Sequence, residues 1–287
     1  MEIFALIPGG NFYVEIPGIR SRPECEITVF DFESGGAAHL RTGGFDGLID
    51  CGSEFRYEQT LLPYLRTRGI NRLDSLILSH GDAQHIGGAL SVLRDFAPRQ
   101  IVDTPLADRS STRRSFHAAL AASGTGKSFA RRGDHLAISP TTSLRVLYPP
   151  AGYQRPAADD KALVLRLECG NARVLFMSDS GFATEQWLLK NEPDLAADIV
   201  VKGEHAKDHS GTVDFLAAVA PRAVICTAPE IGRGNAFLDA SSAEIAARGI
   251  VVFRQDQTGA VQLAIQRNGE IFVRGYLNGQ ILRSRTR

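Results

Sequence analysis

The residues whose types and spacing could do chemistry gather in the segment SHGDAQHIGG, residues 79–88. His80, Asp82 and His85 lie there within a few positions of one another, directly after the apolar strand pattern LDSLIL. Catalytic groups of α/β proteins gather at the carboxyl ends of strands, where a loop can turn several side chains toward one point. Imidazole and carboxylate together suit zinc, manganese or iron. The segment therefore predicts a metal centre.

Two later segments place similar residues after strands. Asp179 ends the apolar run RVLFMSD, and Glu204, His205 and His209 follow the strand pattern DIVV. Taken alone, a pair of histidines at this spacing is commonly a polar loop that caps a helix, and one Asp after a strand is commonly a helix N-cap. Acids and imidazoles at three strand ends favour a metal site over that interpretation. We interpret His209 as a surface residue.

The elements that must position these residues alternate along the first half of the chain. Residues 26–32 and 45–50 read as strands, with a hairpin turn at Gly43-Gly44 before the second. Leucines on one face of residues 57–68 predict a helix that Gly69 ends. Strand, helix and strand follow at 73–78, 86–96 and 100–102, which is typical of an α/β layered fold.

The second half of the chain continues the alternation. Strands are predicted at 143–148, 162–169, 173–178, 198–201, 223–226 and 250–254, and helices at 183–190, 212–219 and 241–248. Residues 110–132 are expected to be helical at first and then irregular around residues 124–126. Asn268-Gly269 predicts the tight turn of a terminal hairpin. With no internal repeat or linker, we expect one domain with two sheets and outer helices.

Composition narrows the class of protein. The chain has 287 residues, of which 44% are hydrophobic, and 32 basic residues balance 32 acidic ones. It can bury a sizeable core, and zero net charge excludes binding to nucleic acid by bulk charge alone. No window reaches the roughly 18 apolar residues of a membrane span, and a basic signal-peptide flank is missing. We expect a soluble chain as given, with free, buried cysteines at 25, 51, 169 and 226.

Beyond these patterns, the chain resembles the C-terminal metallo-β-lactamase-like domain of the ComEC competence family. Three runs carry the resemblance: LLPYLRTRGINRLDSLILSHGDAQHIGGA at 61–89, ADIVVKGEHAKDHSGTVDFLAAVAPRAVI at 197–225, and GIVVFRQDQTGAVQL at 249–263. It implies an α/β metallo-β-lactamase fold, a four-layer αββα sandwich. We accordingly expect a single domain over 1–287, with an N-terminal extension at 1–25, a core at 26–265, and a terminal strand and basic tail at 266–287.

For function, the resemblance implies hydrolysis of phosphodiester bonds in DNA by a metal-activated water, with one or two divalent ions, zinc or manganese. In the family, this domain is thought to degrade one strand of incoming DNA while the other strand enters through a membrane channel. The implied partners are single-stranded DNA and the membrane channel of a longer parent protein. The implied location is the cytoplasm or the cell membrane.

The resemblance also implies a set of metal ligands: His80, Asp82, Gln84, His85, Asp179 and His205. Asp179 is the candidate to bridge two ions, whereas His80 and Asp82 are the candidate catalytic residues, Asp82 by orienting the attacking water.

Three positions depart from the family pattern, and they remove ligands from one metal position more than from the other. Gln84 replaces the second aspartate of H-x-D-x-D-H, Gly36 replaces the acid of G-Q-G-D, and Glu204 replaces the first histidine of H-H-G-S. A neutral amide binds a hard dication more weakly than a carboxylate does. Three outcomes stay open: a one-metal hydrolase, a two-metal hydrolase in which Asp160 or Glu204 replaces a lost ligand, and a degenerate site that no longer catalyses a reaction.

The longest stretch with charges of one sign runs from residue 109 to residue 132. It contains no acid and six bases, namely Arg109, Arg113, Arg114, Lys127, Arg131 and Arg132. These bases could follow a DNA backbone, and the alternative is a solvated helix and loop. The segment Gly126-Lys127-Ser128 is no phosphate-binding loop, because Ala121 stands where its first glycine belongs, so we expect no nucleotide cofactor.

Three functions therefore stay open. The first is a metal-dependent nuclease or phosphodiesterase. The second is a non-catalytic domain of the same fold that binds DNA or a partner. The third is a hydrolase of another small substrate, such as a lactone or a thioester, because a fold alone does not define a substrate.

Overall fold

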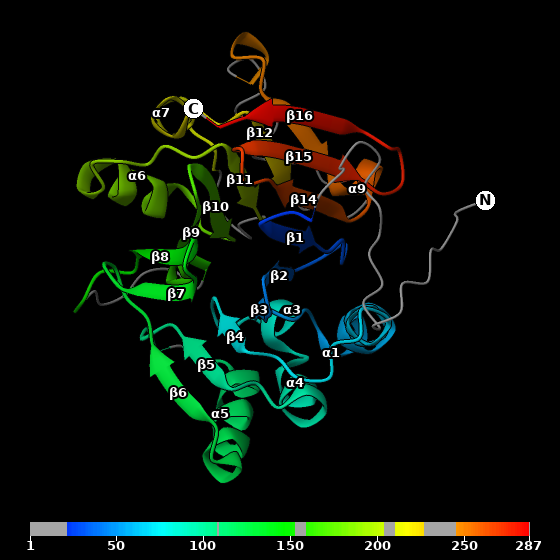
Figure 1. Cartoon of the computed structure of the whole chain (residues 1–287). Coiled ribbons are helices and arrows are strands. Elements are labelled where there is room, and N and C mark those ends of the chain that lie inside the picture. The colour runs from blue at the N-terminus through cyan, green and yellow to red at the C-terminus, as the bar shows by residue number, and fades with distance from the viewer. Residues whose placement is uncertain (1–21, 108, 153–158, 204–209, 227–244, 287) are drawn as a thin grey trace.

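The computed structural model describes residues 22–107, 109–152, 159–203, 210–226 and 245–286. Their strands form two sheets that lie face to face (Figure 1). The first sheet has nine strands in the order β16 (Ile281–Arg285), β15 (Glu270–Gly275), β14 (Val261–Ile265), β1 (Cys25–Val29), β2 (Ala38–Thr42), β3 (Phe45–Ile49), β4 (Ser75–Leu78), β5 (Gln100–Asp103) and β6 (Gly126–Phe129). The second has seven, in the order β13 (Val251–Arg254), β12 (Ala223–Cys226), β11 (Ile199–Lys202), β10 (Ala172–Ser178), β9 (Val164–Cys169), β8 (Thr142–Tyr148) and β7 (His135–Ser139).

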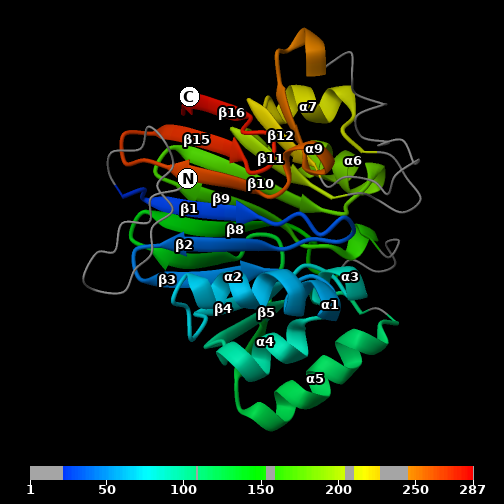
Figure 2. The same cartoon turned by 90° about the vertical axis from the view of Figure 1, so that its right-hand side faces the viewer.

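Helices cover the outer face of each sheet (Figure 2). The first sheet is covered by α1 (Glu54–Arg56), η1 (Tyr57–Leu61), α2 (Leu62–Thr67), α4 (Ala89–Phe96) and α5 (Ser111–Ser123). The second is covered by α6 (Phe182–Asn191) and α7 (Val213–Val219). Short helical turns, α3 (Ala83–Ile86), η2 (Asp159–Lys161) and α9 (Gln255–Thr258), lie between strands. This arrangement confirms the predicted αββα sandwich.

Strands that are apolar on both faces explain why the chain forms four layers. In β4, Ile77 packs between the two sheets, whereas Leu76 and Leu78 face the helices of the first sheet. In β10, Phe176 packs between the sheets and Met177 faces the helices of the second. Successive side chains of a strand point to opposite faces, so a continuous apolar run requires cover on both sides.

The parallel strands bring the predicted site residues to one edge of the sandwich. In the first sheet β3, β4 and β5 are mutually parallel, and in the second β10, β11 and β12 are. The hydroxyl oxygens of Ser79, after β4, and Ser178, at the end of β10, lie 3.1 Å apart and join the two sets of strand ends. The strand ends of both sheets therefore meet at a single site.

The structure departs from the sequence-based expectations at a few elements. Residues 126–129, expected to be irregular, form β6, and neither β7 nor β16 was expected. All three are short strands with several exposed residues, so they lack the apolar pattern that predicts a strand. The helix expected at 86–96 is two helices, since Gly87 and Gly88 pack closely against Glu54 and Tyr57. Of the helix expected at 241–248, residues 241–244 lie outside the described residues.

Other expectations concern the cysteines, the membrane and the domain limits. The four cysteines are free and buried, as predicted. Across the described ranges, every helix is too short or too polar to cross a membrane. Most of the predicted N-terminal extension lies outside the described residues, so the division into extension, core and tail stays a prediction.

A buried polar network fixes α2 to the outer face of the first sheet. His39 lies with Nε2 3.0 Å from Asp46 Oδ1 and with Nδ1 3.2 Å from the hydroxyl of Tyr64 on α2. That hydroxyl is also 2.9 Å from Thr28 Oγ1. Burial lowers the pKa of His39 below its ordinary 6.5, although Asp46 favours the charged form.

This network predicts a pH dependence of stability. Below about pH 6.5 the unfolded chain binds a proton at His39 more readily than the folded chain does, so the free energy of unfolding falls as the pH falls. We expect urea unfolding to show a smaller loss of stability between about pH 7.5 and 5.5 in His39→Gln than in the wild type. His135→Gln, at an exposed histidine of β7, should keep the wild-type loss. Equal losses in wild type and His39→Gln would contradict this role.

Candidate metal centre

Two imidazoles and one carboxylate converge at the shared strand ends. His85 Nε2 lies 2.9 Å from Asp179 Oδ2, and His80 Nε2 lies 3.9 Å from the same oxygen. The two rings are 4.5 Å apart, centre to centre. His80 and His85 are almost completely buried, whereas the side chain of Asp179 is 17% exposed. The structure thus brings two histidines that follow β4 of the first sheet together with an aspartate that follows β10 of the second.

The hydrogen bonds of Ser79 fix the tautomer of His80. The Ser79 hydroxyl is 2.6 Å from Asp50 Oδ2, and it must donate its single proton there because an ionised carboxylate only accepts. It is also 2.9 Å from His80 Nδ1, which must then be the donor. His80 Nε2 is left with a lone pair. Among the described residues this buried nitrogen has no hydrogen-bond partner, as expected of a metal ligand.

His85 is held between two carboxylates. Its Nδ1 lies 2.9 Å from Asp50 Oδ2 and its Nε2 lies 2.9 Å from Asp179 Oδ2. Burial opposes a charge on this ring, but the two carboxylates outweigh burial and raise the pKa of His85 well above 6.5. The Nε2 proton must be released before this nitrogen can bind an ion, so metal affinity is expected to fall as the pH falls.

The pKa values of His80 and Asp179 are both lowered, in contrast to that of His85. Burial and the neighbouring His85 lower the pKa of His80, which keeps that ring neutral. Burial would raise the pKa of Asp179, but His85, His80 and Lys202 outweigh it and lower this pKa to about 2. The site therefore combines an anionic carboxylate with a neutral imidazole, a donor set that suits a divalent transition metal.

Asp50 is a site residue that the sequence analysis missed. Asp50, His80 and His85 can each place one ligand atom within 4.8 Å of the others. Asp50 already accepts hydrogen bonds from the backbone amide and hydroxyl of Ser79 and contacts His85 Nδ1, so we assign it the orientation of both imidazoles. Its signal in the sequence is an acid directly after the strand pattern FDGLI, the same signal that indicated Asp179.

Two residues of the site have strained backbones. Asp50 has a φ of 56° and Ser178 has a φ of 49°, in the left-handed region that side chains with a Cβ rarely adopt. Each follows or ends a strand at the site edge. Such strain persists where the surrounding structure holds a residue in one functional orientation.

For the other predicted ligands the structure shows different contacts, and their part in binding metal stays a prediction. Asp82 is exposed, and its carboxylate caps α3 by accepting a hydrogen bond of 2.7 Å from the Gln84 amide. The side chain of Gln84 is also exposed. Asp160, considered as a replacement acid, accepts hydrogen bonds from Gly181 and Thr184 at the start of α6. His205, like Glu204 and His209, lies outside the described residues.

The six bases of the basic stretch fall into two groups. Arg113 is buried and binds the Asp103 carboxylate at 3.0 Å, so this residue departs from the prediction that it contacts DNA. Arg132 pairs with Glu192. The other four are exposed on the surface: Arg109, Arg114, Lys127 and Arg131. The stretch thus contributes fewer surface charges than its composition indicates.

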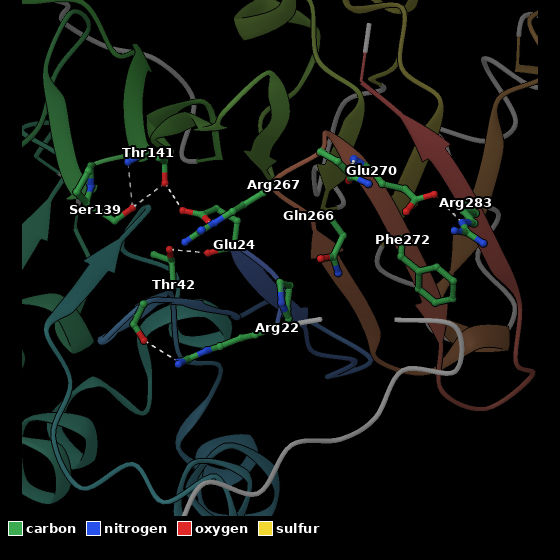
Figure 3. A pocket seen from close by; sticks show the side chains of 14 residues that line it. Arg22, Glu24, Thr42, Ser139, Thr141, Gln266, Arg267, Glu270, Phe272 and Arg283 are labelled. Atoms are coloured by element: carbon green, nitrogen blue, oxygen red, sulfur yellow. Dashed lines mark hydrogen bonds and ion pairs between the residues drawn. The ribbon is translucent and has the colours of Figure 1, made fainter. Parts of the chain in front are cut away.

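A larger cavity, of about 1190 Å³, lies at the opposite ends of the strands (Figure 3). Its arginines already have protein partners: Arg22 donates to the Gly43 carbonyl, Arg267 to Glu24 and Arg283 to Glu270, each at 2.8 Å. The residues that line this cavity include no histidine or cysteine. The volume of this cavity therefore does not make it the candidate functional site, which lies at the opposite edge of the sandwich.

Comparison with known proteins agrees with this geometry. Residues 40–234 match the sequence pattern of the metallo-beta-lactamase superfamily, and the chain therefore belongs to that superfamily. It is 28% identical to ComE operon protein 3 of Bacillus subtilis, over 83% of this chain and 33% of that protein. It is 27% identical to competence protein ComA of Neisseria gonorrhoeae, over 86% and 33%. These relatives confirm the resemblance to the ComEC family, and the chain spans about a third of their length.

Solved structures show the same fold. The metallo-beta-lactamase fold protein YhfI from Bacillus subtilis aligns with a TM-score of 0.56 and 16% identity, over 80% of this chain and 95% of that one. Zn(2+)-bound PqqB from Methylobacterium extorquens aligns with a TM-score of 0.52 and 12% identity, over 84% and 100%. At these identities the similarity shows the fold alone.

The role assigned to Asp50 predicts the effect of Asp50→Asn. An amide keeps the shape of the side chain but has one accepting oxygen, so it cannot accept from the Ser79 backbone amide at one end and from the Ser79 hydroxyl and His85 at the other, as the carboxylate does. We expect affinity for Mn²⁺ or Zn²⁺ to fall by about 10- to 100-fold in isothermal titration calorimetry. Asp46→Asn is the matched control, because Asp46 forms a histidine–aspartate pair of the same sheet away from the site. Equal affinities in Asp50→Asn and the wild type would contradict the assignment.

Proposed function

We propose that this chain is a metal-dependent phosphodiesterase that cleaves DNA. The observation that carries the proposal is the convergence of His80 Nε2, His85 Nε2 and Asp179 Oδ2, in which the buried His80 nitrogen has a lone pair and no hydrogen-bond partner in the described part of the chain. These three residues would hold a zinc or manganese ion. The superfamily supports a divalent metal, and PqqB, described as Zn(2+)-bound, supports zinc.

The residues of the chain have separate tasks in this proposal. When bound, a divalent ion supplies Lewis acidity toward a phosphoryl oxygen and makes a nearby water more acidic. Asp179 supplies negative charge, since its low pKa keeps it ionised. Asp50 and Ser79 hold the two imidazoles with Nε2 toward Asp179. Asp82, exposed beside this site, is the candidate to orient the attacking water.

DNA is the substrate that the relatives and the surface favour. The names of the relatives refer to competence and, in Haemophilus influenzae, to "Recombination protein 2", which is 26% identical over 75% of this chain. The exposed bases Arg109, Arg114, Lys127 and Arg131 would contact phosphates of single-stranded DNA. We further propose that the domain acts beside the membrane channel of a longer parent protein.

The test is cleavage of labelled single-stranded DNA. The wild-type chain is assayed with Mn²⁺, with Zn²⁺ and with EDTA, beside His80→Ala and the exposed-site control His135→Ala. Metal-dependent cleavage in the wild type and in His135→Ala, with none in His80→Ala, supports the proposal. Equal cleavage by the wild type and His80→Ala overturns it. Turnover of a lactone or thioester without cleavage of DNA points to another hydrolase of this fold, and metal-free DNA binding alone points to a non-catalytic domain.

A further inference from the structure

Lys202 is a buried cation at the edge that carries the metal centre. It ends β11 and is only 1% exposed. Its Nζ lies 3.3 Å from the carbonyl oxygen of Ser178 and 3.1 Å from that of Gly203. A lysine is almost never fully buried unless other groups compensate its charge, because removing an ammonium from water is costly. A buried lysine beside two strained strand ends therefore calls for an explanation.

Lys202 lies beside the proposed metal ligands. It lines the same pocket as His85, Asp50 and Gly36, the position where the ComEC pattern has an acid. The next residue, Gly203, packs against the bridging candidate, since a Cβ at Gly203 would lie 1.9 Å from Asp179 Oδ1. The positive charge of Lys202 also helps to keep the pKa of Asp179 low.

A third buried carboxylate near this edge is that of Glu185 on α6. Glu185 is fully buried, and its oxygens accept hydrogen bonds from the amides of Gly211 and Thr212 and from the Thr212 hydroxyl. Burial raises the pKa of Glu185, whereas these hydrogen bonds and the charge of Lys202 favour its ionised form. Among the buried groups that the structure describes here, with neutral imidazoles, the carboxylates of Asp50, Asp179 and Glu185 and the ammonium of Lys202 leave two negative charges. One divalent ion neutralises them, whereas two ions would leave an excess of positive charge in a buried site.

We propose that the Lys202 ammonium takes the place of a second divalent ion, so that this centre holds one metal ion and one fixed organic cation. This inference rests on the proposed metal centre. Like charges at short range in a protein repel strongly, so the ammonium disfavours a second dication beside Asp179. The loss of acids at Gly36 and Gln84 fits the same account, because a one-ion centre has no need of them.

A cycle of variants tests the proposal through metal stoichiometry. The wild type, Gln84→Asp, Lys202→Met and Gln84→Asp/Lys202→Met are titrated with Mn²⁺ by calorimetry and analysed for bound metal. We expect one bound ion in the wild type and in each single variant, and two in the double variant. The second ion of the double variant should bind at least about tenfold more tightly than any second ion in Gln84→Asp. Lys202→Arg, combined with Gln84→Asp, keeps the charge and should return the count to one.

The outcomes separate this inference from the proposed function. Two ions in the wild type, or equal affinity for a second ion in Gln84→Asp with and without Lys202, overturn the role of Lys202 and leave the metal centre intact. No bound ion in any variant overturns both. If Lys202→Met does not fold, wild-type crystals soaked in Mn²⁺ decide the matter. One anomalous peak per chain supports the inference, and a second peak beside Asp179 overturns it.

Discussion

Replacing His80 by alanine is expected to lower the affinity of the chain for Mn²⁺ or Zn²⁺ by more than about a hundredfold, beyond the effect of an orienting residue. Of the two described ligand histidines, His80 supplies the nitrogen that is already deprotonated, because Ser79 and Asp50 fix its tautomer and burial keeps it neutral. The variant loses this nitrogen and leaves the other ligands in place. Isothermal titration calorimetry with each metal measures the change directly.

The control for this prediction is another histidine of the same chain. His135→Ala, at an exposed position of β7, should bind metal as tightly as the wild type. Circular dichroism shows whether both variants fold. A folded His80→Ala chain with wild-type affinity would exclude His80 from the ligand set and would leave its buried, unpartnered nitrogen without a role.

Asp179→Asn is expected to reduce metal-dependent DNA cleavage by about 10²- to 10³-fold. Asp179 is the only carboxylate that contacts His85 Nε2 and also lies near His80 Nε2 within the described part of the chain. An amide of the same shape removes its negative charge, so it neither compensates a dication nor stabilises the metal-bound form of the site. Initial rates with labelled single-stranded DNA at saturating Mn²⁺ measure the loss.

Asp194→Asn serves as the comparison for Asp179→Asn. Asp194 is partly exposed and pairs with Arg173, so its charge lies on the surface of the same sheet. This variant should cleave DNA at the wild-type rate. Unchanged cleavage in Asp179→Asn, with metal still bound, would show that the reaction does not depend on the carboxylate at the end of β10.

The periodicity of the chain predicted most of the fold, for a physical reason. Strands such as β4 and β10 are apolar on both faces, and a sheet with two apolar faces must be covered on both sides. The strands β6, β7 and β16 escaped prediction. They lie at sheet edges with polar, partly exposed residues, so burial left no pattern in their sequence. Patterns of burial thus reveal interior strands far better than edge strands.

The site was predicted in part. His80, His85 and Asp179 were expected together because each follows an apolar strand. Asp50 follows a strand in the same way, but only the structure shows that it contacts His85. The bases Arg113 and Arg132 read as surface charges because a sequence does not show their buried acid partners, Asp103 and Glu192. Partners distant in the sequence decide whether a charge binds a ligand or the protein itself.

Elemental analysis of the purified wild-type chain tests the central claim most directly. The protein is expressed in medium with added zinc and manganese, freed of loosely bound ions by gel filtration and analysed for bound metal beside His80→Ala. The convergence of His80, His85 and Asp179 predicts a stoichiometric divalent metal in the wild type and its loss in the variant. A folded wild-type chain that retains no metal, even after incubation with zinc or manganese, would contradict the account.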